Sequence, residues 1–342
     1  MSLMELKKII ILIITTLFLV YTVVLTACTT TTPSTTESTP PPSSTTQSNL
    51  FLRQRSEAIP TDAVKITPEF DIYPPMLHSD EYKTPVPLPG PVNTAGAEDS
   101  PFIMPDGNTL YFFFTPDVSI PAEKQLLDGV TGIYMSVKND DGTWREPERL
   151  VLNDDISLDG AEFIQGNIMW FCSARAGYQG INWFSAEMIE GKWQNWQYAG
   201  GQFPESYEVG ELHFSMNWQE LYFHSSRPGG KGGYDIWVTR KIDGNWQEPE
   251  NIEVVNSIET DGWPYFTQDG NELWFLRTYL GTPAIFRSKK INGEWGKPEL
   301  IISQFAGEPS LDNAGNLYFV HHYYKDGVMM EADIYVAEKT LP

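Results

Sequence analysis

The feature that most constrains the fold of this chain is a short motif that occurs five times. Each copy begins with a turn, in most cases an Asp-Gly or Asn-Gly dipeptide or a close relative, and continues into a run of aliphatic and aromatic residues. Such dipeptides favour the positive φ of tight hairpin turns, and the residues after them favour strands. The aliphatic residue (Leu or Met) that opens each aromatic run recurs at intervals of 44 to 59 residues, which leaves room for about four short strands in each repeat. They occupy residues 106–112, 166–171, 217–223, 269–275 and 314–319.

Two further motifs follow the copies in a fixed order. The first is a short strand, usually centred on Ile, at residues 132–134, 182–184, 235–237, 284–286 and 333–335. The second is a turn followed by Trp and Pro, at residues 142–147, 244–249 and 293–298. The second repeat keeps Trp193 but has Trp196 where Pro is expected. Proline in this strand suits an outer edge, where one side of the backbone has no partner.

The fifth repeat lacks its Trp-Pro strand, and a matching segment precedes the first repeat. Residues 81–88 align with residues 245–252, so that Tyr82 takes the Trp position and Pro85 the Pro position. We therefore predict an all-β fold, a five-bladed β-propeller of four-stranded blades whose last blade is closed by an N-terminal strand. Six blades are the alternative count, and two unrelated β-sandwiches the alternative architecture.

The N-terminus has the pattern of a targeting segment. Lys7 and Lys8 precede an apolar run over residues 9–25, and the residues up to Cys28 resemble the lipobox of bacterial lipoproteins. We expect a signal peptide over residues 1–27 and lipid attachment at Cys28, with an uncleaved signal anchor as the alternative. Residues 28–50 then form a Ser/Thr/Pro-rich tether, residues 51–80 a transitional segment, and residues 81–342 the propeller.

The charge balance limits the partners. The chain has 45 acidic and 23 basic side chains, a formal net charge of -22. This charge repels phosphate backbones and anionic lipid head groups, so we expect no nucleic-acid partner and membrane contact only through the lipid anchor. We predict a membrane-anchored, monomeric, extracytoplasmic lipoprotein in the periplasm or at the cell surface.

The third repeat is similar to a known family. Residues 225–237 look like the repeat of TolB-type periplasmic propellers, in which a Ser-x-Arg-x-Gly-Gly loop precedes an Asp-Ile-aromatic strand. Residues 104–107 and 173–177 also fit that repeat, whereas the first, fourth and fifth repeats lack the loop. The resemblance implies a protein-binding or ligand-binding scaffold and no defined reaction.

The stretches that precede the aromatic strands carry acids. These acids are Glu98, Asp99, Asp159, Glu162, Glu208, Glu211, Asp261 and Glu308. In a propeller the first strand of each blade lines the central channel, so about one carboxylate per blade should point toward the axis or lie near it. We expect a ligand site built from Glu162, Glu211 and Glu308, with Trp263 and Tyr265 as aromatic partners. The alternative is that the acids only turn the chain between blades.

The sequence offers neither a regular metal-ligand spacing among its histidines nor a cofactor motif, so we predict no cofactor and no protein-defined metal site. A structural or axial cation such as calcium remains an alternative, because oxygen ligands suit it.

One enzymatic alternative is specific. Five-bladed propellers similar to arabinanases and β-xylosidases place three carboxylates on successive inner strands, one as general acid and another as base. Asp99, Glu162 and Glu211 occupy such positions, although Asp99 is followed by Ser100 and not by the Pro of that family. We thus predict a non-catalytic scaffold that binds an envelope protein or a glycan, with a glycoside hydrolase and a purely structural envelope protein as the alternatives.

Overall fold

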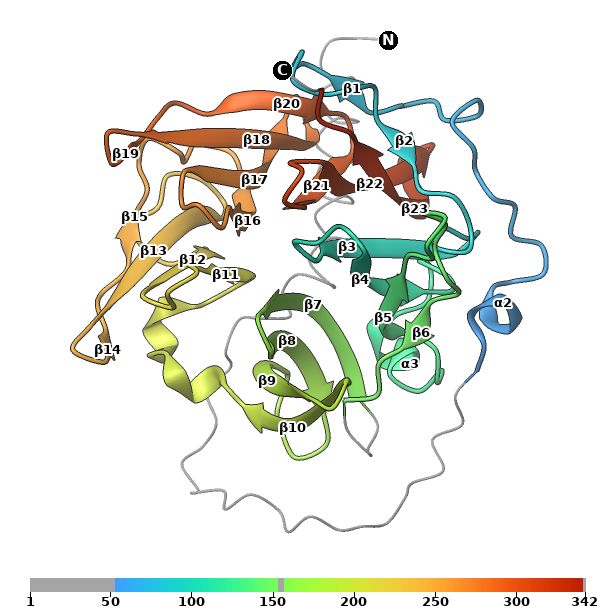
Figure 1. The fold of residues 1–342 in the computed structure, drawn as a ribbon, viewed down its shortest axis with the longest axis horizontal. Helices are drawn as coiled ribbons and strands as arrows, with labels where there is room; N and C mark the ends of the chain where they lie inside the picture. The colour runs from blue at the N-terminus through green and yellow to red at the C-terminus, as the bar shows by residue number, and fades with distance from the viewer. Residues whose placement is uncertain (1–52, 153–156, 341–342) are drawn as a thin grey trace, which may run out of the picture.

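The computed structural model describes residues 53–152 and 157–340. Helices in these residues are short: α2 (Arg55–Ala58), α3 (Ala122–Gln125) and the 3-10 turns Gly200–Gln202 and Glu205–Tyr207. All other regular structure here is β-sheet, so the predicted all-β class is confirmed. The strands are grouped around a central axis, with one strand of each group nearest to it (Figure 1).

The first three repeats form their strands in chain order from the axis outward. The first contains β3 (Ala97–Ile103), β4 (Thr109–Thr115), β5 (Gly132–Val137) and β6 (Glu148–Arg149). The second contains β7 (Ser157–Gln165), β8 (Ile168–Arg175), β9 (Ile181–Ile189) and β10 (Lys192–Tyr198). The third contains β11 (Leu212–Phe214), β12 (Glu220–Ser225), β13 (Asp235–Ile242), β14 (Asn245–Trp246) and β15 (Glu250–Asn251).

The last two repeats also recruit strands from the N-terminal part of the chain. The fourth contains β16 (Asp261–Phe266), β17 (Glu272–Tyr279), β18 (Thr282–Ile291), β19 (Glu294–Trp295) and β20 (Glu299–Ser303), and β1 (Met76–Leu77) pairs with β20. The fifth contains β21 (Ala306–Leu311), β22 (Leu317–Lys325) and β23 (Val328–Ala337), and β2 (Val86–Pro87) pairs with β23. By hydrogen bonding the described residues form four sheets, because one parallel bridge between Ala332 and Ala97 joins the fifth repeat to the first.

The predicted pairing of the N-terminal segment with the last repeat is present. Val86 lies opposite Val336, and an isolated bridge joins Tyr82 to Lys339. The Asn93 side chain extends this pairing, because its Nδ2 donates to the Leu88 and Ile334 carbonyls at 2.9 Å each and its Oδ1 accepts from the Ile334 N–H at 3.0 Å. The N-terminal segment thus holds the outer side of the fifth repeat.

The recurring aromatic strands form the centre of each repeat. The phenylalanine that ends the Leu-aromatic-Phe run is fully buried in every copy, at Phe112, Phe171, Phe223, Phe275 and Phe319. Burying one such side chain contributes roughly 2–3 kcal/mol, so the motif that defines the repeat in the sequence also supplies its core.

In three repeats an arginine side chain lies over aromatic rings at equivalent positions of the repeat. In the second repeat the Arg175 guanidinium lies 4.2 Å from the Phe184 ring centre and 2.8 Å from Asp159. Arg277 and Asp261 make the equivalent arrangement in the fourth repeat. In the first repeat the arginine is Arg55, which comes from α2 and pairs with Glu98 at 3.2 Å. The transitional segment therefore completes the first repeat.

Candidate functional site

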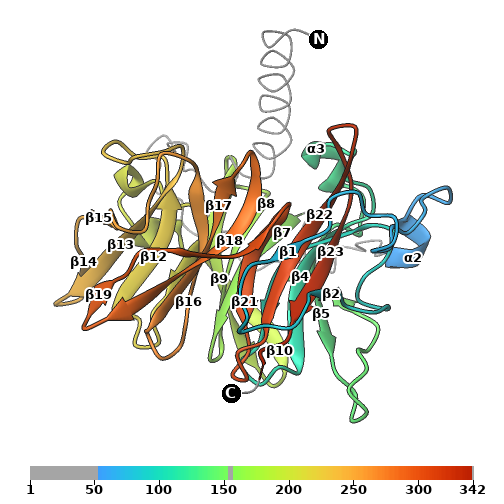
Figure 2. The same cartoon turned by 90° about the horizontal axis from the view of Figure 1, so that it is seen from above.

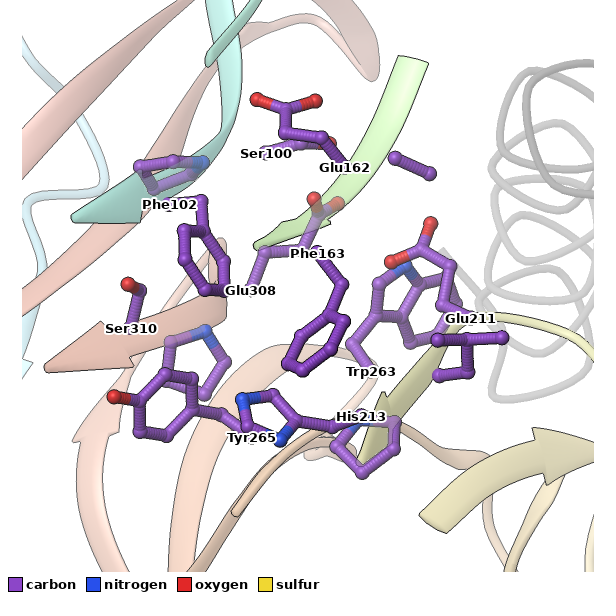
Figure 3. Close-up of a pocket in the computed structure, with 15 residues that line it drawn as sticks. Ser100, Phe102, Glu162, Phe163, Glu211, His213, Trp263, Tyr265, Glu308 and Ser310 are labelled. Atoms are coloured by element: carbon purple, nitrogen blue, oxygen red, sulfur yellow. The ribbon is translucent and has the colours of Figure 1, made fainter. Parts of the chain in front are cut away.

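A cavity lies at the axis, where the inner ends of the five repeats meet (Figure 3). Its volume is ≈ 60 Å³, and each repeat contributes three consecutive residues to its lining. These are residues 100–102 of β3, 161–163 of β7, 211–213 at the start of β11, 263–265 of β16 and 308–310 of β21. The predicted ligand residues Glu162, Glu211, Trp263, Tyr265 and Glu308 therefore line one cavity.

A β-bulge in four of the inner strands aims these residues at the axis. The register shifts in β3, β7, β16 and β21, and each shift contains one non-glycine residue in the left-handed region. A bulge places two residues opposite one on the neighbouring strand and so redirects the following side chains. The left-handed residues are Ser100 (φ 48), Ala161 (φ 53), Trp263 (φ 52) and Glu308 (φ 51).

The three cavity glutamates are buried and have raised pKa values. Burial is the main cause and raises the pKa of Glu162 and that of Glu211 to about 8, because the charged carboxylate loses its hydration. Burial and the negative charge of Asp99 also raise the pKa of Glu308 well above its ordinary value. Near neutral pH Glu162 and Glu211 therefore hold protons that an exposed glutamate would release.

Several polar atoms of the cavity residues accept no hydrogen bond from another described residue. Both carboxylate oxygens of Glu162 are buried and have no such hydrogen bond, and the same holds for Oε2 of Glu308. His213 is 8% exposed, and its Nδ1 lies 3.1 Å from the Phe214 carbonyl, which can only accept. The proton therefore sits on Nδ1, and Nε2 is an acceptor that no described residue satisfies. A buried acceptor without a partner costs about 1–3 kcal/mol, so these atoms favour a donor in the cavity.

Aromatic rings form the walls. The His213 ring lies 4.4 Å from the Phe163 ring and 4.7 Å from the Tyr265 ring, centre to centre. The Tyr265 hydroxyl donates to the Leu311 carbonyl at 2.8 Å, which fixes its ring. Trp263 is 4% exposed, packs 4.7 Å from the His224 ring, and its indole interacts with the Glu211 carboxylate. Both predicted aromatic residues are therefore held rigidly at the cavity.

Asp99 lies beside the cavity and not in its lining. Its carboxylate accepts from the Ser100 N–H at 2.8 Å and lies 3.4 Å from Nε2 of His322. Its negative charge nevertheless raises the pKa of Glu211 and of Glu308. Of the three candidate catalytic carboxylates, two thus line the cavity and Asp99 acts on them through its field.

The remaining acids of the predicted axial set have other roles. Glu98, Asp159 and Asp261 pair with the three arginines described above and do not line the cavity, so the fourth repeat contributes no acid to the lining. Glu208 ends the turn Glu205–Tyr207 at φ 49 and does not line the cavity. The alternative that the acids merely turn the chain therefore applies to Glu208 alone among these four.

Sequence reasoning missed His213, Phe102 and Phe163 as cavity residues. The sequence does contain a signal for them, because a four-residue motif recurs in the inner strands. It begins with Gly or Asp, continues with one variable residue and then Pro, Glu or Leu, and in most copies ends with a residue that has a ring. The copies are residues 99–102, 160–163, 210–213, 262–265 and 307–310, with Ser310 at the ring position of the last.

Two other expectations concern metals and the membrane. Among residues 53–152 and 157–340, no three His, Cys, Asp or Glu side chains are arranged to hold a metal ion, so the calcium alternative gains no support. No helix in this part of the chain is long and apolar enough to cross a membrane. Cys28, the predicted lipidation site, lies outside the described residues.

No protein-family model and no curated protein matches this chain. Several solved structures are similar to it. The endo-arabinase from Bacteroides thetaiotaomicron VPI-5482 has 16% sequence identity and a TM-score of 0.46, with 74% of this chain and 96% of that chain covered. The xylan β-1,4-xylosidase from Bacillus halodurans C-125 has 14% identity and a TM-score of 0.44, with 73% of this chain covered. TolB from Acinetobacter baumannii has 14% identity and a TM-score of 0.37, with 70% covered. This chain spans 54% of the length of each of the last two.

Proposed function

We propose that this chain is an extracytoplasmic five-bladed β-propeller that binds a glycan in its axial cavity without transforming it. The observation that carries the proposal is the convergence of five inner segments, three residues from each, on one cavity of buried acceptors and aromatic rings. A glycan end group presents hydroxyl or amino donors to such acceptors and apolar ring faces to such walls. The five contributions also support the count of five blades, with β2 completing the fifth.

The location of this site follows from the N-terminal sequence. The apolar run, the lipobox-like residues before Cys28 and the Ser/Thr/Pro-rich stretch after it support an anchored lipoprotein outside the cytoplasm. Replacing Cys28 by Ala should abolish metabolic labelling with a fatty acid and membrane partitioning. Labelling that persists in this variant contradicts the anchor.

Glycoside hydrolysis is the second candidate, and the raised pKa of the cavity glutamates supports it. A carboxyl group that stays protonated near neutral pH is what a general acid requires. A hydrolase also needs a second carboxylate that is ionised, and such enzymes separate the two pKa values. Burial raises the pKa of both Glu162 and Glu211 to about 8. Because the two pKa values are raised together and are not separated, they favour binding over catalysis.

The test combines a glycan array with hydrolysis assays on aryl glycosides. The parent protein is compared with the double variant Glu162→Gln, Glu211→Gln and with Glu190→Gln, a control at an exposed position. Glycan binding without turnover, weakened at least about ten-fold in the double variant and unchanged in the control, supports the proposal. Turnover that is lost in the double variant replaces it by the hydrolase, and no binding to any glycan overturns it.

A further inference from the structure

We propose that the group entering the axial cavity is a protonated amine, so that the glycan bound there carries free amino sugars. This inference rests on the proposed function and specifies its ligand. It starts from the chemistry of the cavity lining, whose carboxyl groups, once ionised, are acceptors only.

The acceptors come from three sides of the cavity. Glu162 on β7, Glu211 before β11 and Glu308 on β21 contribute carboxyl groups, and His213 contributes the unsatisfied Nε2. The lining contains no lysine and no arginine. Of its serines, Ser100 donates to Glu308, whereas Ser310 Oγ accepts from the Ile103 N–H at 2.8 Å.

This imbalance distinguishes an amine from a hydroxyl. A sugar hydroxyl is one donor and also an acceptor, so a neutral sugar is bound best where donors and acceptors are mixed. An ammonium group has three donors and no acceptor. It can therefore donate to the buried acceptors nearest to it, among them those of Glu162, without leaving an acceptor of its own unpaired, and its bonds to carboxylates are charge-assisted.

The walls and the size of the cavity agree with this choice. Phe102, Phe163 and Tyr265 present aromatic rings, whose faces attract cations. The ≈ 60 Å³ volume holds a few groups of the size of a water molecule, which is enough for an ammonium and its attached carbon. The sugar ring then stays at the mouth of the cavity. A metal ion is a poorer fit, because in the described ranges no three ligands converge on one point.

Binding of a cation must also move protons. The titratable groups around the cavity come from every inner strand and from the strands behind them: Asp99 on β3, Glu162 on β7, Glu211 and His213 at β11, His224 on β12, Tyr265 on β16, Glu308 on β21 and His322 on β22. A positive charge among these acids favours their ionised form. An amine ligand should thus expel protons from Glu162 or Glu211 near pH 7, whereas a neutral sugar should not.

The experiment uses two oligosaccharides that differ only in the amine. Oligomers of glucosamine and of N-acetylglucosamine of equal length are titrated calorimetrically into the protein near pH 6.5, at physiological salt. We expect the amino form to bind at least about ten-fold more tightly, the effect of roughly one charge-assisted hydrogen bond. That preference should disappear in Glu162→Gln, Glu211→Gln and persist in Glu190→Gln.

A second measurement on the parent protein does not depend on the folding of a variant. The binding enthalpy of the amino oligomer, measured in two buffers of different ionisation enthalpy, should reveal proton release. Equal affinity for the two oligomers, a preference that survives in the double variant, or an enthalpy independent of the buffer overturns the amine inference and leaves glycan binding standing. If neither these oligomers nor any other glycan binds, the proposed function itself fails.

Discussion

At the scale of single residues, two buried acids three positions apart on one strand have different roles. Asp159 and Glu162 lie on the same inner strand, on either side of the left-handed Ala161. Asp159 pairs with Arg175 inside its repeat, whereas the Glu162 carboxylate has no partner among the described residues and lines the cavity. The bulge thus assigns one acid to the stability of the repeat and the next to the site.

The first prediction concerns the Arg175–Asp159 pair. Replacing Arg175 by Met leaves the Asp159 carboxylate, which is 5% exposed, without its counterion, and should lower the free energy of unfolding by about 3–5 kcal/mol. The double variant Asp159→Asn, Arg175→Met should recover most of the loss, because no buried charge remains. Urea denaturation measures both.

The control for this prediction is Arg240→Met. Arg240 is half exposed and pairs with Glu220 at 3.0 Å and Glu250 at 2.7 Å, so its loss should cost less than about 1 kcal/mol. An equal cost at positions 175 and 240 contradicts the interpretation that burial makes the Asp159 pair important.

At the scale of elements, two equivalent asparagines pin the outer edge of their repeats. Asn256 exchanges hydrogen bonds of 2.8 Å with the N–H and the carbonyl of Ile236 on β13. Asn93 does the same for Ile334 on β23, although it precedes its partner by 241 residues. The two isoleucines occupy the same position of the repeat. Asn93 of the N-terminal segment therefore makes in the fifth repeat the hydrogen bonds that Asn256, which follows β13 in the chain, makes in the third.

This equivalence gives the second prediction. Asn93→Ala removes three hydrogen bonds and leaves the Ile334 N–H buried without a partner, which should destabilise the protein by about 2–3 kcal/mol. Asn256→Ala is the matched control and should have a similar effect, measured as the midpoint of urea unfolding. A much smaller effect at Asn93 shows that the N-terminal segment is dispensable for the fifth repeat.

Local patterns explain which elements were predictable from the sequence. The turn dipeptides and the aromatic runs after them are short-range signals, so the strands from β4 to β23 that carry these motifs lie where the repeats place them. The cavity acids were found because they occupy aligned positions. Their separation from Glu98, Asp159 and Asp261 was not predicted, because it depends on the bulges. The roles of Arg55 and Lys65 depend on contacts across the whole chain, which no local pattern encodes.

At the scale of the whole molecule, the segment before the first repeat joins three repeats. β1 pairs with β20 of the fourth repeat, Lys65 forms ion pairs with Glu331 and Asp333 of the fifth, and Arg55 pairs with Glu98 of the first. In Figure 2 this segment runs along the outside of the strands that it contacts. Its residues therefore belong to the folded unit, upstream of the segment that supplies β2.

The third prediction is a dependence of stability on pH that reflects the buried acids. The folded-state pKa is raised to about 8 for Glu162 and Glu211, above the ordinary 4.5 of the unfolded chain. Their stabilising contribution is therefore complete below pH 4.5 and is lost as the pH rises toward 8. The pKa values of buried His213 and His224 are lowered from 6.5 to about 3, so these histidines change the stability with pH only below pH 6.5.

Between pH 6.5 and 8.5 the buried glutamates therefore determine whether the stability rises or falls with pH. The free energy of unfolding should fall by roughly 1 kcal/mol per pH unit for each of these glutamates. Thermal unfolding across this window should show the fall in the parent and in Glu190→Gln, and a flatter profile in Glu162→Gln, Glu211→Gln. A parent protein whose stability rises over the same window contradicts the assignment of raised pKa values to the cavity.

The pairing of β2 with β23 also sets an order of events for a newly made chain. A ribosome releases residues 86–87 long before residues 335–336, their partners, so the N-terminal strand must remain unmatched while all the other repeats emerge. Contacts so distant in sequence form slowly, because a long loop must close first. The last event in assembly is therefore the meeting of the two ends, and until then the open edges of β23 and the early strand are exposed to other chains. Such a chain should depend on chaperones while it folds more than a chain whose strands pair as they are synthesised.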